Sequence, residues 1–398
     1  MAKYRFGDIC KVLNGRAYKQ NELLASGKYP ILRVGNFFSS DRWYYSDMEL
    51  PEDKYCDYED LLFAWSASFG PKIWDGEKVI YHYHIWKLIP NDDIADKWYL
   101  YYWLRHSVNR LTAGTHGSVM AHMTKGDMEN QSIELPSLQT QRKISSILRT
   151  IDEKIHNNVA INNNLLEQIK TICTAWLSEY KPFDGVMPSD WVETPLSDIA
   201  EFISGYSYKG TELTDSTIAM ATIKNFDRKG GFKLDGYKEI IPSSKLKESQ
   251  HAELFDTLVA HTDLTQNAEV IGNAELVMSK SGYDDIVFSM DLVKVLPKKD
   301  GVSKFLIAAI LQDKKFKAHC LGYVNGTTVL HLSKKALPEY KLLLPSDFST
   351  LKPLDEVVTA LYKQVSSNIS ENTYLEELRE SLLPKLMSGE LDVSDIEI

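Results

Sequence analysis

The feature that most constrains this chain is a long helical pattern that occurs twice. The first copy runs from Leu135 to Trp176, and its apolar residues follow a seven-residue repeat for about four heptads. A seam of this kind is typical of a coiled coil rather than of an ordinary surface helix. The second copy begins at Leu344, about 210 residues later, and opens with the same Leu-Pro-Ser sequence. The two helices are therefore expected to pair with each other.

The predicted seam has asparagines at its centre. Its residues in the two helices are Leu148, Ile151, Ile155, Asn158, Asn162 and Leu165, and Val358, Leu361, Val365, Asn368, Asn372 and Leu375. Asparagine at a seam position costs stability and fixes the register of the pair. If a pseudo-two-fold axis relates the copies, the helices run antiparallel and form a rod of roughly 57 Å. We then expect Asn158 and Asn162 to contact Asn368 and Asn372.

The second helix has two irregular features. Arg379 interrupts its apolar series, and Pro353 should delay its first turn because proline has no N–H to donate and crowds the preceding turn. The acidic tail from Ser388 is expected to fray. The alternative is that the two helices are unrelated and that each packs on its own domain. The shared Leu-Pro-Ser start and the recurring asparagines favour a pair.

The segments that precede the two helices are copies as well. They share nine aligned pairs, namely Asp8/Asp198, Ile9/Ile199, Gly15/Gly205, Tyr18/Tyr208, Lys19/Lys209, Glu22/Glu212, Leu23/Leu213, Asn36/Asn225 and Phe37/Phe226. Short alternating runs predict strands in the first part of each copy, and a helix follows in the second. The predicted fold is α+β, with two pseudo-two-fold-related globular domains separated by an antiparallel two-helix coiled coil. The expected order is a domain at 1–136, a helix at 137–180, a linker and second domain at 181–345, and a helix with an acidic tail at 346–398.

Composition narrows the class of protein. The chain has 398 residues, of which 43% are hydrophobic and 25% charged, and no apolar run approaches the roughly 20 residues that a membrane span requires. The first residues have no apolar segment typical of a signal peptide, and the four cysteines are scattered. These features predict a cytoplasmic protein with reduced thiols. The net charge of −10 does not by itself suggest nucleic-acid binding, but binding depends on where the basic residues lie.

Motifs for catalysis are missing from the sequence. There is no phosphate-binding loop, no HExxH, GxSxG or calcium-binding loop, and no glycine-rich cofactor loop. His82 and His84 alternate in YHYH, which could indicate a metal site, but one face of an edge strand is the favoured reading. The sequence therefore predicts no catalytic or metal-binding residues and no cofactor of its own.

Loops in both copies have a composition that suits DNA contacts. Glycine lets a backbone approach a phosphate closely, lysine neutralises the phosphate, and Arg, Lys and Asn can reach base edges. Hydroxyl groups beside glycine add phosphate-directed donors. The candidates in the first copy are Gly15, Tyr18, Lys19, Arg33, Asn36 and Ser118, and those in the second are Gly205, Tyr208, Lys209, Lys224, Asn225, Thr327 and Thr328.

The order of these parts resembles the specificity subunit of type I restriction–modification systems. The resemblance spans nearly the whole chain, and the segment Gln139–Ile155 is the closest to the family pattern. The match includes the GxxYK elements at 15–19 and 205–209 and the GNF and KNF elements at Gly35–Phe37 and Lys224–Phe226. It also includes the Gly-Ser and Gly-Thr segments before the two helices. The start of the second helix, near Leu351–Asp355, departs from the glutamine-rich start that is usual in the family.

The resemblance implies that each globular domain reads one half of a bipartite duplex DNA target. It also implies that the coiled coil sets the half-site spacing and docks two methyltransferase subunits, with restriction subunits joining through the complex. S-adenosylmethionine, ATP and Mg²⁺ would then belong to the partner subunits, and this chain would not be an enzyme. Two alternatives stay open: an adaptor that holds two protein partners without DNA, and a self-contained enzyme acting on nucleic acid.

Overall fold

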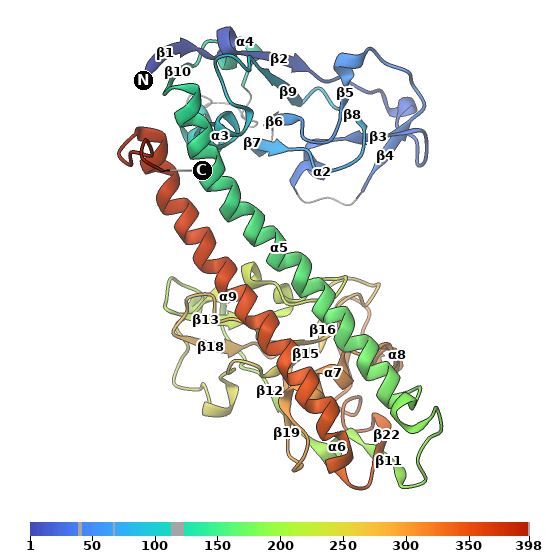
Figure 1. The fold of residues 1–398 in the computed structure, drawn as a ribbon. Helices are drawn as coiled ribbons and strands as arrows, with labels where there is room; N and C mark the ends of the chain where they lie inside the picture. The colour runs from blue at the N-terminus through green and yellow to red at the C-terminus, as the bar shows by residue number, and fades with distance from the viewer. Residues whose placement is uncertain (39–41, 67, 113–122, 397–398) are drawn as a thin grey trace. The chain divides into compact units, whose positions relative to one another are not determined.

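The computed structural model describes residues 1–38, 42–66, 68–112 and 123–396. The chain divides into two compact units. Unit 1 comprises Met1–Lys154 and Leu375–Ile398, and unit 2 comprises Ile155–Tyr374. Each contains sheets and helices, so the predicted α+β class is confirmed (Figure 1).

Unit 1 contains two four-stranded sheets and a two-stranded ribbon. The first sheet has the order β2 (Cys10–Asn14), β9 (Ile85–Pro90), β6 (Leu61–Ser66) and β7 (Ser68–Ile73), and the second has the order β4 (Tyr44–Ser46), β3 (Tyr29–Leu32), β8 (Val79–Tyr81) and β5 (Tyr55–Cys56). The ribbon pairs β1 (Ala2–Arg5) with β10 (Ser132–Leu135), and the helices are α1 (Phe6–Ile9), α2 (Val34–Phe38), α3 (Lys97–Thr112) and α4 (Lys125–Glu129).

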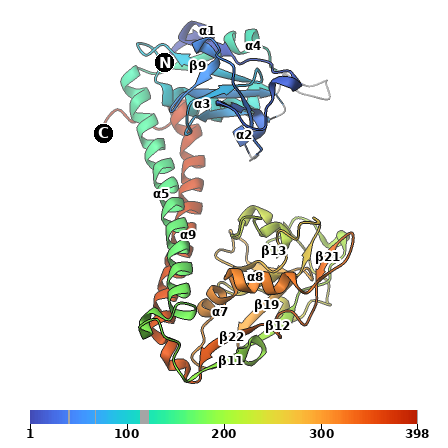
Figure 2. The same cartoon turned by 90° about the vertical axis from the view of Figure 1, so that its right-hand side faces the viewer.

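Unit 2 repeats this plan. Its four-stranded sheet has the order β12 (Ala200–Ser204), β19 (Leu292–Pro297), β15 (Thr257–Ala260) and β17 (Ala274–Leu276). The remaining sheets are β14 (Lys238–Glu239), β13 (Ile218–Ala221) and β18 (Asp285–Phe288); β16 (Thr262–Asp263), β21 (Leu330–Leu332) and β20 (Val324–Asn325); and the ribbon β11 (Trp191–Pro195) with β22 (Lys341–Pro345). Its short helices are α6 (Leu196–Ile199), α7 (Lys304–Leu311) and α8 (Lys314–Leu321), and α7 lies beside the four-stranded sheet (Figure 2).

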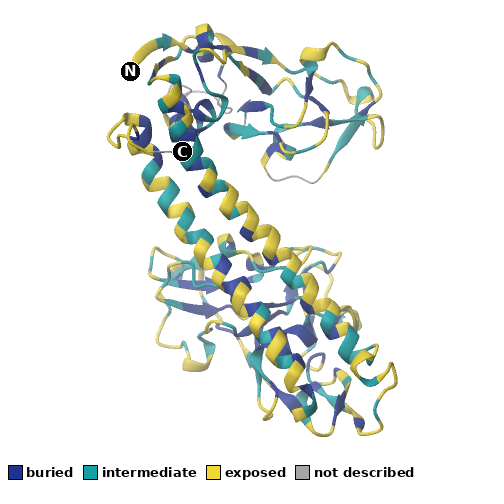
Figure 3. Ribbon diagram, in the orientation of Figure 1, coloured by how far each residue is buried: buried dark blue, intermediate teal, exposed yellow. Residues whose placement is uncertain are grey.

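Two long helices, α5 (Leu138–Leu177) and α9 (Lys352–Ser388), contribute residues to both units. Helix α5 starts directly after Ser137, whereas a 3-10 turn at Phe348–Leu351 precedes α9. The delayed helical start that Pro353 predicts is therefore confirmed. All twelve predicted seam residues are buried or half-buried (Figure 3).

The asparagines meet within unit 2. Asn158 Nδ2 donates to Asn372 Oδ1 at 2.8 Å and to Glu371 Oε2 at 2.8 Å, and Asn368 Nδ2 donates to Asn162 Oδ1 at 2.7 Å. These pairs confirm the predicted contact and require the helices to run antiparallel there. The buried amides satisfy one another, so a shift of the helices would leave polar groups without partners.

Arg379 has a partner that the sequence did not reveal. Its Nη1 donates to Asp152 Oδ1 at 2.5 Å, and Tyr102 OH donates to Asp152 Oδ2 at 2.6 Å. All three residues belong to unit 1. A largely buried ion pair therefore replaces an apolar seam contact at this level of the helix.

The expectation of a frayed tail is wrong for the residues up to 396. Val393 is only 2% exposed and packs in the core of unit 1. Lys143 Nζ also donates to the main-chain oxygen of Ser394 at 2.6 Å. Burial of Val393 helps to anchor the acidic tail, because removing apolar surface from water is favourable.

Candidate functional site

In both units, the GxxYK loop lies at one end of a four-stranded sheet. This sheet is β2–β9–β6–β7 in unit 1 and β12–β19–β15–β17 in unit 2. Strands β2 and β6 end where β9 begins, because both are antiparallel to β9. The same holds for β12, β15 and β19 in unit 2. We call the three residues before β9 and before β19 the crossing turn, which is His82–His84 in unit 1 and Ser289–Asp291 in unit 2.

The crossing turn is held by the same main-chain hydrogen bonds in both units. The six equivalent pairs are Gly15 N–Ile85 O and Gly205 N–Leu292 O; Arg16 N–Tyr81 O and Tyr206 N–Phe288 O; Tyr83 N–Arg16 O and Met290 N–Tyr206 O; His82 N–Leu32 O and Ser289 N–Ala221 O; Trp65 N–His84 O and His261 N–Asp291 O; and Ile85 N–His82 O and Leu292 N–Ser289 O. Their lengths lie between 2.7 and 3.3 Å. The turn therefore joins three parts of each unit. These are the GxxYK loop, the end of the parallel pair (β3 and β8, or β13 and β18) and the end of β6 or β15.

The repeated glycines are explained by this crossing. A Cβ on Gly15 would lie 2.3 Å from the main-chain oxygen of His82, and one on Gly205 would lie 2.1 Å from that of Ser289. Any larger residue would push the backbones apart. The fold alone thus accounts for Gly15 and Gly205, whatever else binds there.

A glutamate that the site prediction did not include shapes each GxxYK loop. Glu22 receives two hydrogen bonds from the Arg16 guanidinium, at 2.7 and 3.0 Å, and one from the Lys19 backbone N–H at 2.8 Å. These donors, the Arg16 side chain first, lower the pKa of Glu22 to about 2. The three-residue spacing of Lys19 and Glu22, typical of a capping box, is the signal that could have found it.

In unit 2 a different side chain supports the same glutamate. Glu212 accepts from the Lys209 backbone N–H at 2.6 Å and from the Tyr206 hydroxyl at 2.8 Å, and these bonds lower its pKa. Tyr206 therefore takes the place of Arg16. The loop conformation is preserved although the side chain that stabilises it has changed.

The predicted loop residues divide into exposed cations and packed aromatics. Lys19 and Lys209 are exposed. Tyr18 is half-buried, lies under the Arg16 guanidinium at 5.0 Å and stacks on His82 with ring centroids 6.2 Å apart. Tyr208 is half-buried beside the cluster that contains Tyr206. The lysines are available to a ligand, and the tyrosines hold the loop in place.

The asparagines after the parallel strands are engaged by their own loops. Asn36 accepts from the Arg33 N–H at 3.3 Å and donates to the Arg42 carbonyl at 2.9 Å. Asn225 is fully buried and bonds in the same way to the Thr222 N–H and the Lys233 carbonyl. Both amides thus shape the backbone in this structure.

The cations beside these asparagines differ in exposure. Lys224 is exposed, whereas Arg33 is half-buried with its guanidinium 5.0 Å from the Tyr44 ring. Thr327 and Thr328 are exposed in the β20–β21 loop, where their carbonyls accept from Gln266 Nε2 at 2.9 and 3.3 Å. Ser118 lies outside the described residues.

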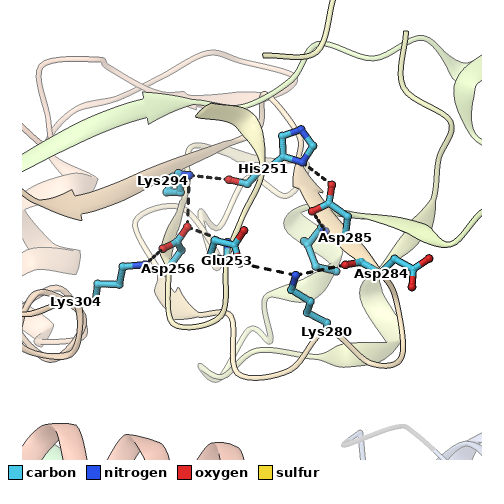
Figure 4. Close-up of polar contacts among 9 residues, drawn as sticks. His251, Glu253, Asp256, Lys280, Asp284, Asp285, Lys294 and Lys304 are labelled. Carbon is cyan, nitrogen blue, oxygen red and sulfur yellow. Dashed lines mark hydrogen bonds and ion pairs between the residues drawn. The ribbon is translucent and has the colours of Figure 1, made fainter. Parts of the chain in front are cut away.

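An ion network surrounds the buried Asp256, which directly precedes β15 in unit 2 (Figure 4). Asp256 is 2% exposed and accepts from Lys304 at 2.5 Å, while Lys294 Nζ lies 3.4 Å from its other oxygen and donates to the His251 carbonyl at 2.7 Å. Unit 1 repeats the core of this network with Asp60 and Lys87, which are 2.6 Å apart. In such pairs, mutual attraction offsets the cost of removing both charges from water.

The His82 side chain lies in the crossing turn of unit 1. Burial, together with the nearby His84 and Arg33, lowers the pKa of His82 to about 4, so its ring is neutral at pH 7. Within residues 1–38, 42–66, 68–112 and 123–396, no three His, Cys, Asp or Glu side chains form a group that could hold a metal. Among the helices of these residues, none combines the length and the apolar composition that a membrane span requires.

Comparison with known proteins gives consistent results. Residues 1–170 match the model of the type I restriction modification DNA specificity domain. The chain is 22% identical over 352 residues to the type I restriction enzyme MjaVIII specificity subunit of Methanocaldococcus jannaschii, covering 85% of this chain and 80% of the relative. It is 21% identical to the EcoBI specificity subunit of Escherichia coli over 48% of this chain and 44% of the relative.

A solved structure shares the fold. The S subunit of a type I restriction–modification system from M. genitalium superposes with a TM-score of 0.57 at 16% identity, covering 97% of this chain and 95% of that one. This likeness shows that the two chains share a fold along nearly their whole length. The chain is therefore similar to type I restriction–modification specificity subunits, in sequence to the family model over residues 1–170 and in fold over nearly its whole length.

Proposed function

We propose that this chain selects the DNA sequence on which a type I restriction–modification complex acts, with each unit reading one half of a bipartite duplex target. The observation that carries this proposal is the duplicated sheet end. Each unit has an exposed lysine, Lys19 or Lys209, on its GxxYK loop. Equivalent glutamate hydrogen bonds and an equivalent crossing turn hold this loop in position in both units. A repeated, pre-organised cationic loop suits two equivalent contacts with the phosphates of one duplex.

The remaining candidates receive different roles in the proposal. Lys224, Thr327 and Thr328 are exposed and are proposed as further contacts in unit 2, with Arg33 and Ser118 as contacts in unit 1. Asn36 and Asn225 are assigned to shaping the loops that carry these contacts, because their amides bond to main-chain groups. Phosphate contacts position a protein on DNA, whereas contacts with base edges specify the sequence.

The long helices are proposed to act as the spacer. A rigid antiparallel pair would fix the separation of the two half-sites, and its outer faces would dock two methyltransferase subunits. The asparagine pairs support this role because they tie the helices to one register. In this proposal the chain recognises the DNA sequence, and the partner subunits carry out catalysis with S-adenosylmethionine, ATP and Mg²⁺.

A reconstitution experiment tests the proposal against its two alternatives. The chain, the methyltransferase subunits and their mixture are each incubated with S-adenosylmethionine and duplex DNA. We expect sequence-specific adenine methylation only from the mixture. Methylation by the chain alone would indicate a self-contained enzyme. Specific methylation by the partner subunits alone would reduce this chain to an adaptor.

A further inference from the structure

The crossing turn combines a constant backbone with variable side chains. Its six main-chain hydrogen bonds recur in both units, yet none of its three side chains does. His82, Tyr83 and His84 in unit 1 correspond to Ser289, Met290 and Asp291 in unit 2. A position with fixed geometry and changing chemistry can present different groups to a ligand in the same place.

The middle residue of the turn projects in each copy. Tyr83 is 38% exposed and Met290 is 58% exposed, although both are large and apolar. Single exposed apolar residues are common on protein surfaces, so exposure alone says little. These two, however, occupy equivalent positions, and each donates its N–H to the residue that follows the crossing glycine. The GxxYK lysine proposed to contact phosphate lies three residues further along the same loop.

The neighbours of the turn give each unit its own chemistry. In unit 1, Trp65 donates from Nε1 to the Tyr83 carbonyl at 2.8 Å, and the two rings lie 6.0 Å apart. In unit 2 the corresponding position is His261, and the Asp291 carboxylate accepts from Thr262 at 3.1 Å. Tyr83 is therefore supported by an aromatic cluster, whereas Met290 stands beside a polar group.

We propose that Tyr83 and Met290 are specificity-determining residues, each contacting base edges in the half-site read by its unit. This proposal rests on the proposed function. Apolar side chains recognise the thymine methyl group in the major groove, and a rigid turn can place such a side chain without a large loss of conformational freedom. The flanking lysine would hold the phosphate backbone while the turn reaches the bases.

The test is a side-chain exchange in the assembled methyltransferase complex. Met290→Tyr gives unit 2 the side chain of unit 1, and Met187→Tyr is the matched control. Met187 is also an exposed methionine of unit 2, at 42%, and lies in the segment before β11. The readout is the set of methylated sequences recovered from a randomised DNA pool. If Met290→Tyr prevents assembly, Met290→Leu and Met290→Thr give the same readout with less added volume.

We expect Met290→Tyr to change base preference by about tenfold at one or two positions of a single half-site, the size of one mismatched base pair. The other half-site and the Met187→Tyr pattern should stay as in the wild type. An unchanged preference would overturn the inference, as would a uniform loss across all sequences, which indicates a structural role. Absence of specific methylation from the wild-type complex would instead refute the proposed function.

Discussion

At the scale of single residues, equivalent positions keep their geometry while their partners change. Glu22 and Glu212 each accept a hydrogen bond from the backbone N–H of the lysine three residues earlier. The second donor differs, because Glu22 also accepts from a guanidinium and Glu212 from a phenol. Charge is thus not what the loop requires. A hydrogen-bond donor of suitable length at the position of Arg16 and Tyr206 is sufficient.

The exposed lysines give the first prediction. Lys209→Ala should weaken DNA binding by the complex about equally for all sequences and lower the salt slope by about one, because one phosphate contact is lost. The control is Lys299→Ala, since Lys299 is exposed but follows the opposite end of β19. Affinities measured across a salt series decide the matter. A changed base preference would show that Lys209 contacts bases.

Glu275 gives a pH prediction. Its carboxylate is buried and accepts from the Gly231 N–H at 2.7 Å and from Gln312 at 3.3 Å. Burial raises its pKa from 4.5 to about 7 despite the Gly231 bond and the charge of Lys170. The folded state therefore binds the proton more tightly than the unfolded state. Its contribution to stability is present below pH 4.5 and is lost as pH rises towards 7.

The loss corresponds to about 3 kcal/mol for a shift of this size. Glu275→Gln keeps an acceptor for Gly231 but cannot ionise, so it should flatten the pH dependence of unfolding between pH 5 and pH 8. Denaturant unfolding of both proteins across this range provides the measurement. Parallel curves for the wild type and the variant would contradict the assignment.

At the scale of elements, the sequence predicts what depends on periodicity and repetition. The long helices, their antiparallel asparagine pairs and the duplicated sheets follow from spacing and self-similarity. The helices' borders and the site details depend on tertiary contacts instead. Asp152 as the partner of Arg379, and Val393 in the core, involve residues far apart in the chain with no local signature.

The candidate residues show the same limit. The pattern located the loops, but it could not distinguish an exposed lysine from a buried asparagine within them. Asn225 is a residue type that can contact base edges, but it is fully buried. Its amide bonds instead to the Thr222 N–H and the Lys233 carbonyl. The crossing turn was not predicted, because its residues differ between the two copies.

The asparagine layer can be tested directly. Asn162→Ala removes the acceptor of the Asn368 amide and should cost about 1–3 kcal/mol, the penalty for an unsatisfied buried donor. The neighbouring Asn163 is exposed on the same helix, and Asn163→Ala should change stability by no more than about 0.5 kcal/mol. Unfolding free energies from denaturant titration compare the two. Equal costs would mean that the layer adds no specific interaction.

At the scale of the whole molecule, the acidic net charge is compatible with the DNA recognition that we propose. The net charge of −10 is an average, and the exposed lysines at the two sheet ends are local exceptions. We infer that partner subunits complete the contact with DNA, so that this chain need not be basic throughout. The duplicated units then act on two half-sites independently of each other.

That independence is tested most directly by exchanging one unit. Residues 181–345 are replaced by the corresponding segment of a relative, and methylated adenines are mapped in DNA modified by the complex before and after. We expect one half of the target sequence to change while the other half and the spacing between them remain. A target that changes in both halves, or in neither, would contradict it.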